Sequence, residues 1–300
     1  MCQGTDRLYG TTDSLFSVVK CCSCELIRLY PWPSPKDFQR YYPTNYWFRA
    51  DDAPAARLEE QYRRFVLRDH VSFVKRALGA PATCGPVLDV GCGGGLFPRM
   101  LREAGYTAHG LDFATDAAKV AWRVNRVPTV AGLLPQAPFA AESLGGVSLF
   151  HVLEHLYEPR EYVESAWRLL RPGGKLVVQV PNVACWQFSL LGVRWNGLDI
   201  PRHLVNFRAK DVSSLLASCG FEILRQKFFS LRDNPAGLAT SLAPSLDPMA
   251  RRVRGVDETP RQRLGRDVLY LGLVAACLPF AAAEAAFRAG STVMIEARKK

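Results

Sequence analysis

Val87-Leu88-Asp89-Val90-Gly91-Cys92-Gly93-Gly94-Gly95 is the stretch of this 300-residue chain that decides the fold. Its apolar residues predict a short buried strand with Asp89 near its carboxyl end, and its glycines predict a tight turn into a helix over Leu96–Ala104. In open sheets of parallel strands flanked by helices, ligands bind at the carboxyl ends of the strands. This turn is therefore the expected ligand site.

The glycine pattern also restricts the ligand. A dinucleotide would require G-x-G-x-x-G, and here the third glycine position is Leu96. Asp89 stands before the first glycine, where a carboxylate suits a cationic ligand better than two phosphates. Asp112, about 20 residues further along at the end of a second predicted strand, is placed to accept ribose hydroxyls. S-adenosylmethionine (SAM) carries an ammonium, a sulfonium and no phosphate, so it suits both carboxylates.

The glycine stretch resembles motif I, D-x-G-x-G, of the class I SAM-dependent methyltransferases. Val147–Leu156 is similar to the fourth strand and following helix of that superfamily, and Leu170–Val178 is similar to its Pro-Gly-Gly turn into strand five. Pro201-Arg202-His203-Leu204 and Cys219-Gly220-Phe221 resemble a subgroup acting on small molecules. The resemblance covers roughly residues 86–231. It implies SAM as cofactor, bound by Asp89, Gly91, Gly93, Asp112, Phe113, Leu133 and Phe150.

Alternating strand and helix patterns predict an α/β fold with a doubly wound, mostly parallel, seven-stranded Rossmann-like sheet. Strands are expected at 86–90, 107–111, 128–131, 146–151, 175–180, 221–231 and 290–297. We expect an N-terminal zinc-ribbon-like segment, a linking helix, a SAM-binding core, a helical insertion or lid, and a final core strand. Their ranges are 1–49, 50–80, 81–232, 233–288 and 289–300.

Cysteines mark the N-terminal segment. Cys21 and Cys24 form a C-x-x-C pair, and Cys2 lies upstream. The segment resembles the N-terminal zinc-binding segment of some sugar and natural-product methyltransferases, where two such pairs hold the metal. The position of a fourth ligand falls before Met1, so a truncated zinc site is expected, or else a small apolar hairpin whose cysteines pack. The aromatic stretch Tyr41–Trp47 is expected to cover the cofactor cleft or to join the core.

Four residues are candidates for the chemistry. An oxygen or carbon acceptor requires a base or a metal as well as alignment with the donor. His151, Glu154 and His155 have the spacing of one helix face after strand four, and His203 follows strand five. In one alternative, His151 or His203 is a general base. In another, Glu154 and His155 contribute to a divalent metal site, as a resemblance to small-RNA 2′-O- and quinone O-methyltransferases implies. In a third, Glu154 and His155 only brace the helix.

The loop after strand five is expected to contact the substrate. Its candidate residues are Trp195, Asp199 and Arg202, and Arg202 has an ion pair as its alternative role. Leu133 stands where related proteins often carry an acid beside the adenine. Apolar and backbone contacts are therefore expected there.

The chain has a net charge of +10, spread over much of its length. An acidic partner is one interpretation, and a solvated arginine-rich surface is the other. No RNA-binding module is recognisable, so nucleic acid is not the expected partner. Val268–Phe287 is apolar apart from Glu284 and is interrupted by Pro279. We expect it to form helices over the sheet and a lid, with peripheral membrane contact as the alternative.

Together these features predict a SAM-dependent methyltransferase acting on oxygen or carbon of a small molecule of the sugar, polyketide or quinone type. An RNA 2′-O-methyltransferase and a non-catalytic SAM-binding or membrane-associated protein are the alternatives. A cytoplasmic location is expected, because the first residues contain no apolar signal-peptide region. The sequence names neither the acceptor nor the oligomeric state.

Overall fold

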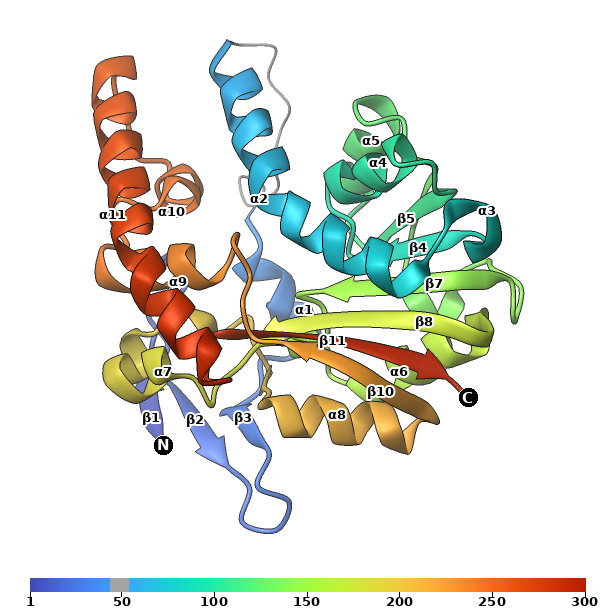
Figure 1. Ribbon diagram of the computed structural model, residues 1–300. Helices are drawn as coiled ribbons and strands as arrows, with labels where there is room; N and C mark the ends of the chain where they lie inside the picture. Colours follow the sequence, from blue (N-terminus) through green and yellow to red (C-terminus); the bar gives the residue numbers. More distant parts are fainter. Residues whose placement is uncertain (44–53) are drawn as a thin grey trace. The chain divides into compact units, whose positions relative to one another are not determined.

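Two sheets organise the chain in the computed structural model, which describes residues 1–43 and 54–300 (Figure 1). The chain forms two compact units. Unit 1 comprises Met1–Tyr46, Pro181–Asp211 and Phe228–Val293, and unit 2 comprises Trp47–Val180, Val212–Lys227 and Met294–Lys300. The Thr44–Trp47 part of the expected aromatic cluster lies outside the described residues.

Unit 2 contains the larger sheet, which has seven strands among the described residues in the order β10-β11-β8-β7-β4-β5-β6. The strands are β4 Val87–Val90, β5 Ala108–Asp112, β6 Thr129–Ala131, β7 Leu144–Phe150, β8 Leu170–Pro181, β10 Phe221–Lys227 and β11 Thr292–Lys299. The pairs β6–β5, β5–β4, β4–β7 and β7–β8 are parallel, and β10 pairs with β11 antiparallel. The expected doubly wound, mostly parallel, seven-stranded Rossmann-like sheet is therefore confirmed.

Helices lie on both sides of these strands, as α2 and α8 show in Figure 1. They are α2 Pro54–Leu78, α3 Pro81–Cys84, α4 Leu96–Glu103, α5 Thr115–Arg123, α6 Pro159–Leu169 and α8 Ala209–Ser218, with 3-10 turns η3 Leu134–Gln136 and η4 Leu153–His155. Apolar residues of α2 and α4, including Phe73, Phe97 and Leu101, form a buried cluster with Val87 and Val177 of the sheet. This packing holds the turn between β4 and α4 against the sheet.

Three elements differ from the sequence-based expectation. β8 begins at Leu170, because Leu170 already pairs with Leu144 before the register shifts. β10 ends at Lys227, the last residue paired with β11, rather than at residue 231. The segment after β7 is the short 3-10 turn η4 and not the first turn of an α-helix, because His151 has a positive φ of 56° that stops regular helix geometry there.

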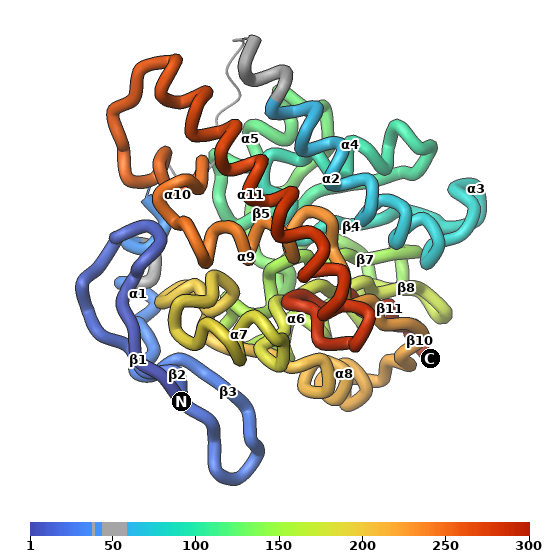
Figure 2. Tube along the Cα trace, turned by 60° about the vertical axis from the view of Figure 1, so that its left-hand side comes forward, coloured from blue at the N-terminus to red at the C-terminus, as the bar shows by residue number. Residues whose placement is uncertain are grey.

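Unit 1 contains a smaller antiparallel sheet in the order β1-β2-β3-β9. Its strands are β1 Cys2–Gly4, β2 Phe16–Lys20, β3 Ile27–Tyr30 and β9 Val205–Asn206. The other elements are α1 Pro35–Phe38, η1 Gln39–Tyr41, α7 Trp186–Leu191, η5 Gly192–Arg194, η6 Asn196–Leu198, α9 Asn234–Leu242, α10 Pro248–Val253 and α11 Pro260–Ala286. Pairing of β3 with β9 joins the N-terminal hairpin to the loop that carries His203. The long helix α11 packs along α9 (Figure 2).

Candidate functional site

Asp89 lies at the carboxyl end of β4 and is buried. Its Oδ1 accepts a hydrogen bond of 2.7 Å from the hydroxyl of Ser148 on the neighbouring strand β7. The parallel register places Asp89 opposite Ser148 and Gly110, so the pair follows from sheet geometry. This bond orients a carboxylate at the strand ends, which is the expected position for a group that binds a cationic ligand.

Asp112 ends β5 and connects that strand to the glycine turn. Its Oδ2 accepts from the backbone N–H of Gly93 at 2.8 Å, and its Oδ1 accepts from the N–H of Ala114 at 2.9 Å. Burial raises the pKa of Asp112, while these two N–H groups act in the opposite direction. The carboxylate is thus held in one orientation on the strand edge where Asp89 also ends.

The glycines of the turn have different roles. Gly91, Gly93 and Gly95 all have positive φ angles, which glycine adopts without the strain of a Cβ. A Cβ on Gly91 would lie 2.6 Å from Cγ2 of Val152, and one on Gly95 would lie 2.8 Å from Cβ of Ala121. A Cβ on Gly93 would meet nothing within 4 Å. The backbone at Gly93 is therefore open, so a ligand can approach it closely.

Two apolar side chains flank this edge. Phe113, directly after β5, and Leu133, after β6, are both exposed although they are large and apolar. Phe150 differs: its ring packs edge-on against Phe97 and His70, with ring centroids 5.0 and 5.1 Å apart. Its expected contact with the cofactor stays a prediction.

These groups fit SAM. The edge offers a carboxylate beside an open glycine backbone, a second carboxylate at the next strand, and exposed apolar side chains that suit an adenine ring. Carboxylates accept hydrogen bonds from an ammonium group and from ribose hydroxyls. The roles assigned to Asp89, Gly91, Gly93, Asp112, Phe113 and Leu133 remain predictions that the geometry supports.

His151 follows β7 directly and is held on both ring nitrogens. Nδ1 lies 3.1 Å from Oε1 of Glu154, and Nε2 lies 2.8 Å from Nε2 of Gln179 on β8. Because the Gln179 amide nitrogen is a donor, Nε2 carries the lone pair and Nδ1–H donates to Glu154. A non-glycine residue at positive φ is uncommon, and such strain is found at functional sites.

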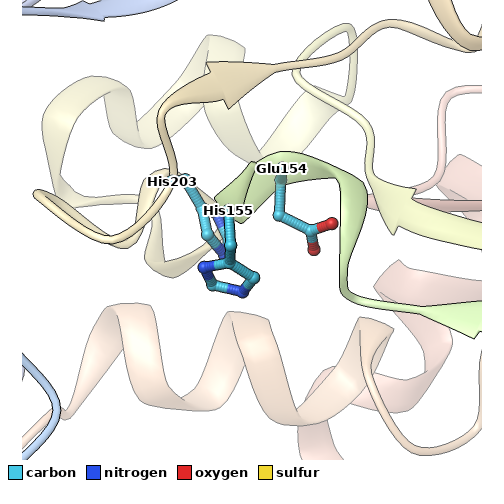
Figure 3. A group of neighbouring side chains, drawn as sticks. All are labelled: Glu154, His155 and His203. Carbon is cyan, nitrogen blue, oxygen red and sulfur yellow. The ribbon is translucent and has the colours of Figure 1, made fainter. Parts of the chain in front are cut away.

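Figure 3 shows Glu154 and His155 projecting from η4, and His203 projecting from the loop before β9. Glu154 is buried and bonded to His151. Glu154 and His155 each offer a ligand atom suited to a cation, and the divalent metal expected there stays a prediction.

His203 belongs to unit 1 and is also oriented by hydrogen bonding. Its Nδ1 donates to the backbone oxygen of Gly197 at 2.9 Å, and its Nε2 lies 3.8 Å from Oδ2 of Asp199. The proposed role of His203 as a base stays a prediction.

Arg202 is completely buried between two carboxylates of unit 1. Its guanidinium donates two bonds of 2.9 Å to Asp6 and two bonds of 2.9 and 2.7 Å to Asp199. The Tyr9 ring lies 4.4 Å from the guanidinium carbon. Burial alone would raise the pKa of Asp6, but Arg202 outweighs it and lowers that pKa to about 2. Arg202 therefore forms the ion pair that was its alternative role.

Trp195 and Asp199, the other two expected substrate residues, line a cavity in unit 1 of about 40 Å³ together with Arg7 and Arg194. Trp195 is buried, and its ring lies 5.7 Å from that of Phe188. A cavity of this size holds water and is too small for an acceptor. Contacts of these residues with a substrate stay a prediction.

The N-terminal thiols do not fit a zinc ion. Cys2 pairs with Val18 in the β1–β2 register, whereas Cys21 lies three residues further along. At about 3.3 Å per residue, this separates Cys2 from Cys21 by about 10 Å along the strand. A zinc ion needs converging ligands. Among the described residues, these three thiols do not form a group whose sulfur atoms lie within 4.8 Å of one another. Zinc bound by Cys2, Cys21 and Cys24 is therefore not supported.

Sequence reasoning missed three residues of these arrangements. Ser148 and Gln179 each interrupt an apolar strand, and a single polar residue inside a buried strand is a signal that could have identified them. Asp6 has no comparable signal. It lies 196 residues from Arg202 in the chain.

Comparisons with known proteins agree with this geometry. A family model described as a methyltransferase domain matches residues 59–226. A Mycolicibacterium smegmatis protein, whose name describes a SAM-dependent methyltransferase, is 30% identical over 180 residues, which are 60% of this chain and 60% of that protein. The chain thus covers less than two thirds of this relative's length.

Two further similarities extend the comparison. A Pseudomonas fluorescens ubiquinone biosynthesis O-methyltransferase is 27% identical over 176 residues, covering 54% of this chain and 74% of the relative. The crystal structure of a SAM-dependent methyltransferase from Archaeoglobus fulgidus has a TM-score of 0.51 at 18% identity. The structural match covers 80% of this chain and 94% of the Archaeoglobus fulgidus chain, and it shows that the two proteins share a fold.

Proposed function

The chain belongs to the class I SAM-dependent methyltransferase family, and from this premise we propose that it transfers the methyl group to oxygen or carbon of a small-molecule acceptor. SAM supplies an electrophilic methyl group on a sulfonium leaving group. An oxygen or carbon nucleophile must lose a proton during such a transfer, so a positioned base is needed. The contact between His151 and Glu154 at the end of β7 carries this proposal.

His151 has the geometry of an oriented base. Donation of Nδ1–H to Glu154 fixes the ring and leaves Nε2 as the basic atom. The Glu154 carboxylate also stabilises the imidazolium that forms when Nε2 takes a proton. An acceptor hydroxyl has to compete with the Gln179 amide for this lone pair. Gln179 therefore holds the ring ready and is displaced from Nε2 when the acceptor binds.

Asp89 and Asp112 are the carboxylates that bind SAM in this proposal. Both carboxylates end neighbouring strands, and each is oriented by a hydrogen bond before any ligand arrives. Preoriented groups lose little freedom on binding, which favours alignment of donor and acceptor. The name of the Pseudomonas relative supports a ring hydroxyl of a quinone-type acceptor among the three expected acceptor types.

The test measures SAM binding first and transfer second. Calorimetry should show that the wild-type chain binds SAM, and Asp89→Ala should abolish this binding while the exposed-residue control Asp116→Ala preserves it. Release of S-adenosylhomocysteine is then followed with hydroxylated benzenes, sugars and polyketide-like phenols. Transfer to one of these classes supports the proposal. Binding without release in all three, or methylation of RNA instead, contradicts it.

A further inference from the structure

Helix α11 exposes a continuous apolar stripe. By length and composition this helix could cross a membrane, and only 22% of its most apolar stretch is buried. Exposed residues recur at spacings of four and three, which places them on one side of the helix. They are Leu264, Val268, Leu271, Ala275, Leu278 and Ala282. Leu264 and Val268 are 63% and 59% exposed, so these positions are not covered by the residues that the structure describes.

The opposite side of α11 is bound to unit 1. The Tyr270 hydroxyl lies 2.8 Å from the Thr240 hydroxyl of α9, and Glu284 Oε2 accepts from Nε2 of Gln187 in α7 at 2.9 Å. Cys277 is buried with the residues of α9. A transmembrane position would break these contacts and expose the Glu284 side to lipid. The helix is therefore suited to lie on a surface and not to span a bilayer.

Acidic groups are absent from the exposed stripe. Asp267 pairs with Arg251 of α10, and Glu284 is completely buried. Between these two acids lie 16 uncharged residues, 268–283, which extend about 24 Å at 1.5 Å per residue. Arg261 and Arg263 are exposed near the start of α11, and neither makes an ion pair in the part of the chain that the structure describes. The stripe is thus apolar with positive charge at one end.

We propose that this stripe of α11 binds the surface of a lipid bilayer that contains anionic lipids. The leucines and Val268 would enter the boundary between headgroups and acyl chains, and Arg261 and Arg263 would contact anionic headgroups. The charge of the stripe is complementary to such a surface, because its two acids are engaged elsewhere. The proposal does not depend on the identity of the methyl acceptor.

A second copy of the chain is a less suitable occupant. The spacing of the stripe is that of a coiled-coil seam, but soluble coiled coils flank the seam with charged residues. Here one flank carries Gly265, Gly272 and Pro279, and beyond Asp267, which pairs with Arg251, residues 268–283 carry no charge on either flank. An apolar surface of this length suits lipid better than a specific helix pair.

Flotation of the full-length chain with vesicles tests this proposal. The wild type should float with phosphatidylcholine–phosphatidylglycerol vesicles, and floating should weaken with pure phosphatidylcholine or with added salt. Leu264→Glu combined with Leu271→Glu should lower the vesicle partition coefficient at least tenfold. Arg261→Gln and Arg263→Gln should each lower it about fivefold, equivalent to about 1 kcal/mol per charge.

Leu15→Glu is the matched control, because Leu15 is 60% exposed and lies outside α11. It should float like the wild type. SAM affinity and melting temperature of every variant verify folding, and they are independent of vesicle binding. A wild type that does not float, or a double variant that floats unchanged, overturns the proposal. So does a lipid-independent dimer that the double variant converts to a monomer, because the occupant would then be a second copy.

Discussion

Asp112 and Gly93 are joined by a hydrogen bond of 2.8 Å from the backbone N–H of Gly93 to Oδ2 of the carboxylate. The bond connects the end of β5 to the glycine turn after β4, so the shape of the turn depends on the neighbouring strand. The other carboxylate oxygen holds the N–H of Ala114. One side chain therefore orients both the turn and the start of the next loop, and it does so where ribose hydroxyls are expected.

Asp112→Asn should weaken SAM binding at least tenfold, about 1.4 kcal/mol. An asparagine has one acceptor oxygen, so its NH₂ group would face the N–H of either Gly93 or Ala114. Calorimetric titration with SAM measures the effect. Asp116→Asn is the control, because Asp116 is exposed on α5 and pairs with Lys119 of the same helix at 3.1 Å. Equal affinities for the two variants would contradict the assignment of Asp112.

His151→Ala should lower kcat by roughly 10²–10⁴ while the dissociation constant of SAM stays unchanged. The expected loss reflects removal of the basic atom, which the contacts with Glu154 and Gln179 hold in one orientation. Rates of S-adenosylhomocysteine release are measured against pH, because a base should also remove one limb of the wild-type profile. His109→Asn, on β5, is the control. A variant with unchanged kcat would exclude His151 as the base.

Arg202→Ala should destabilise the chain by roughly 3–5 kcal/mol, because it removes the cation that neutralises two buried carboxylates. Urea unfolding measures this loss. The triple variant Asp6→Asn, Asp199→Asn, Arg202→Met should recover part of the stability, because it removes the buried charges together. If the single variant unfolds at the urea concentration of the wild type, the buried ion pair contributes little.

The Asp6–Arg202 pair also predicts acid sensitivity. Since the folded-state pKa of Asp6 is lowered to about 2, its contribution is complete above its unfolded value near 4 and is lost as pH falls toward 2.

Glu284 predicts a pH dependence of the opposite sign. Burial raises its pKa to about 7, although the hydrogen bond from Gln187 acts to lower that pKa. The folded chain thus binds more protons than the unfolded chain between about pH 4.5 and 7, so stability from this group falls across that range as pH rises. Cys185 is a titratable neighbour, and burial raises the pKa of its thiol to about 12, so it stays neutral throughout.

Glu284→Gln keeps an acceptor for Gln187 and removes the ionisable group. Melting temperatures at pH 5 and pH 8 should therefore differ less in this variant than in the wild type. Glu161→Gln, at an exposed position of α6, is the control and should preserve the wild-type difference. A wild-type pH dependence that Glu284→Gln leaves intact would contradict the buried carboxyl as its source.

Much of unit 2 was predictable because its signals are local. The strand, glycine turn and helix around Asp89 depend on neighbouring residues, and the alternation of strands and helices indicated the parallel sheet. Sequence spacing also placed His151 and Glu154 within reach of each other, although it assigned a helix where the structure has η4. The zinc prediction at Cys21 and Cys24 is not supported, and the count of cysteines says nothing about the strand register that places Cys2 opposite Val18.

The sequence by itself therefore determined the fold class, the glycine turn after β4 and the two carboxylates at neighbouring strand ends. These depend on periodicity and on the special backbone freedom of glycine, which are properties of short stretches. Only the tertiary structure decided that Asp6 pairs with Arg202 and that α11 turns Glu284 inward and Leu264, Leu271 and Leu278 outward. Both outcomes depend on contacts between segments that are distant in the sequence. Packing partners decide whether a charged residue is paired and which face of an apolar helix is buried.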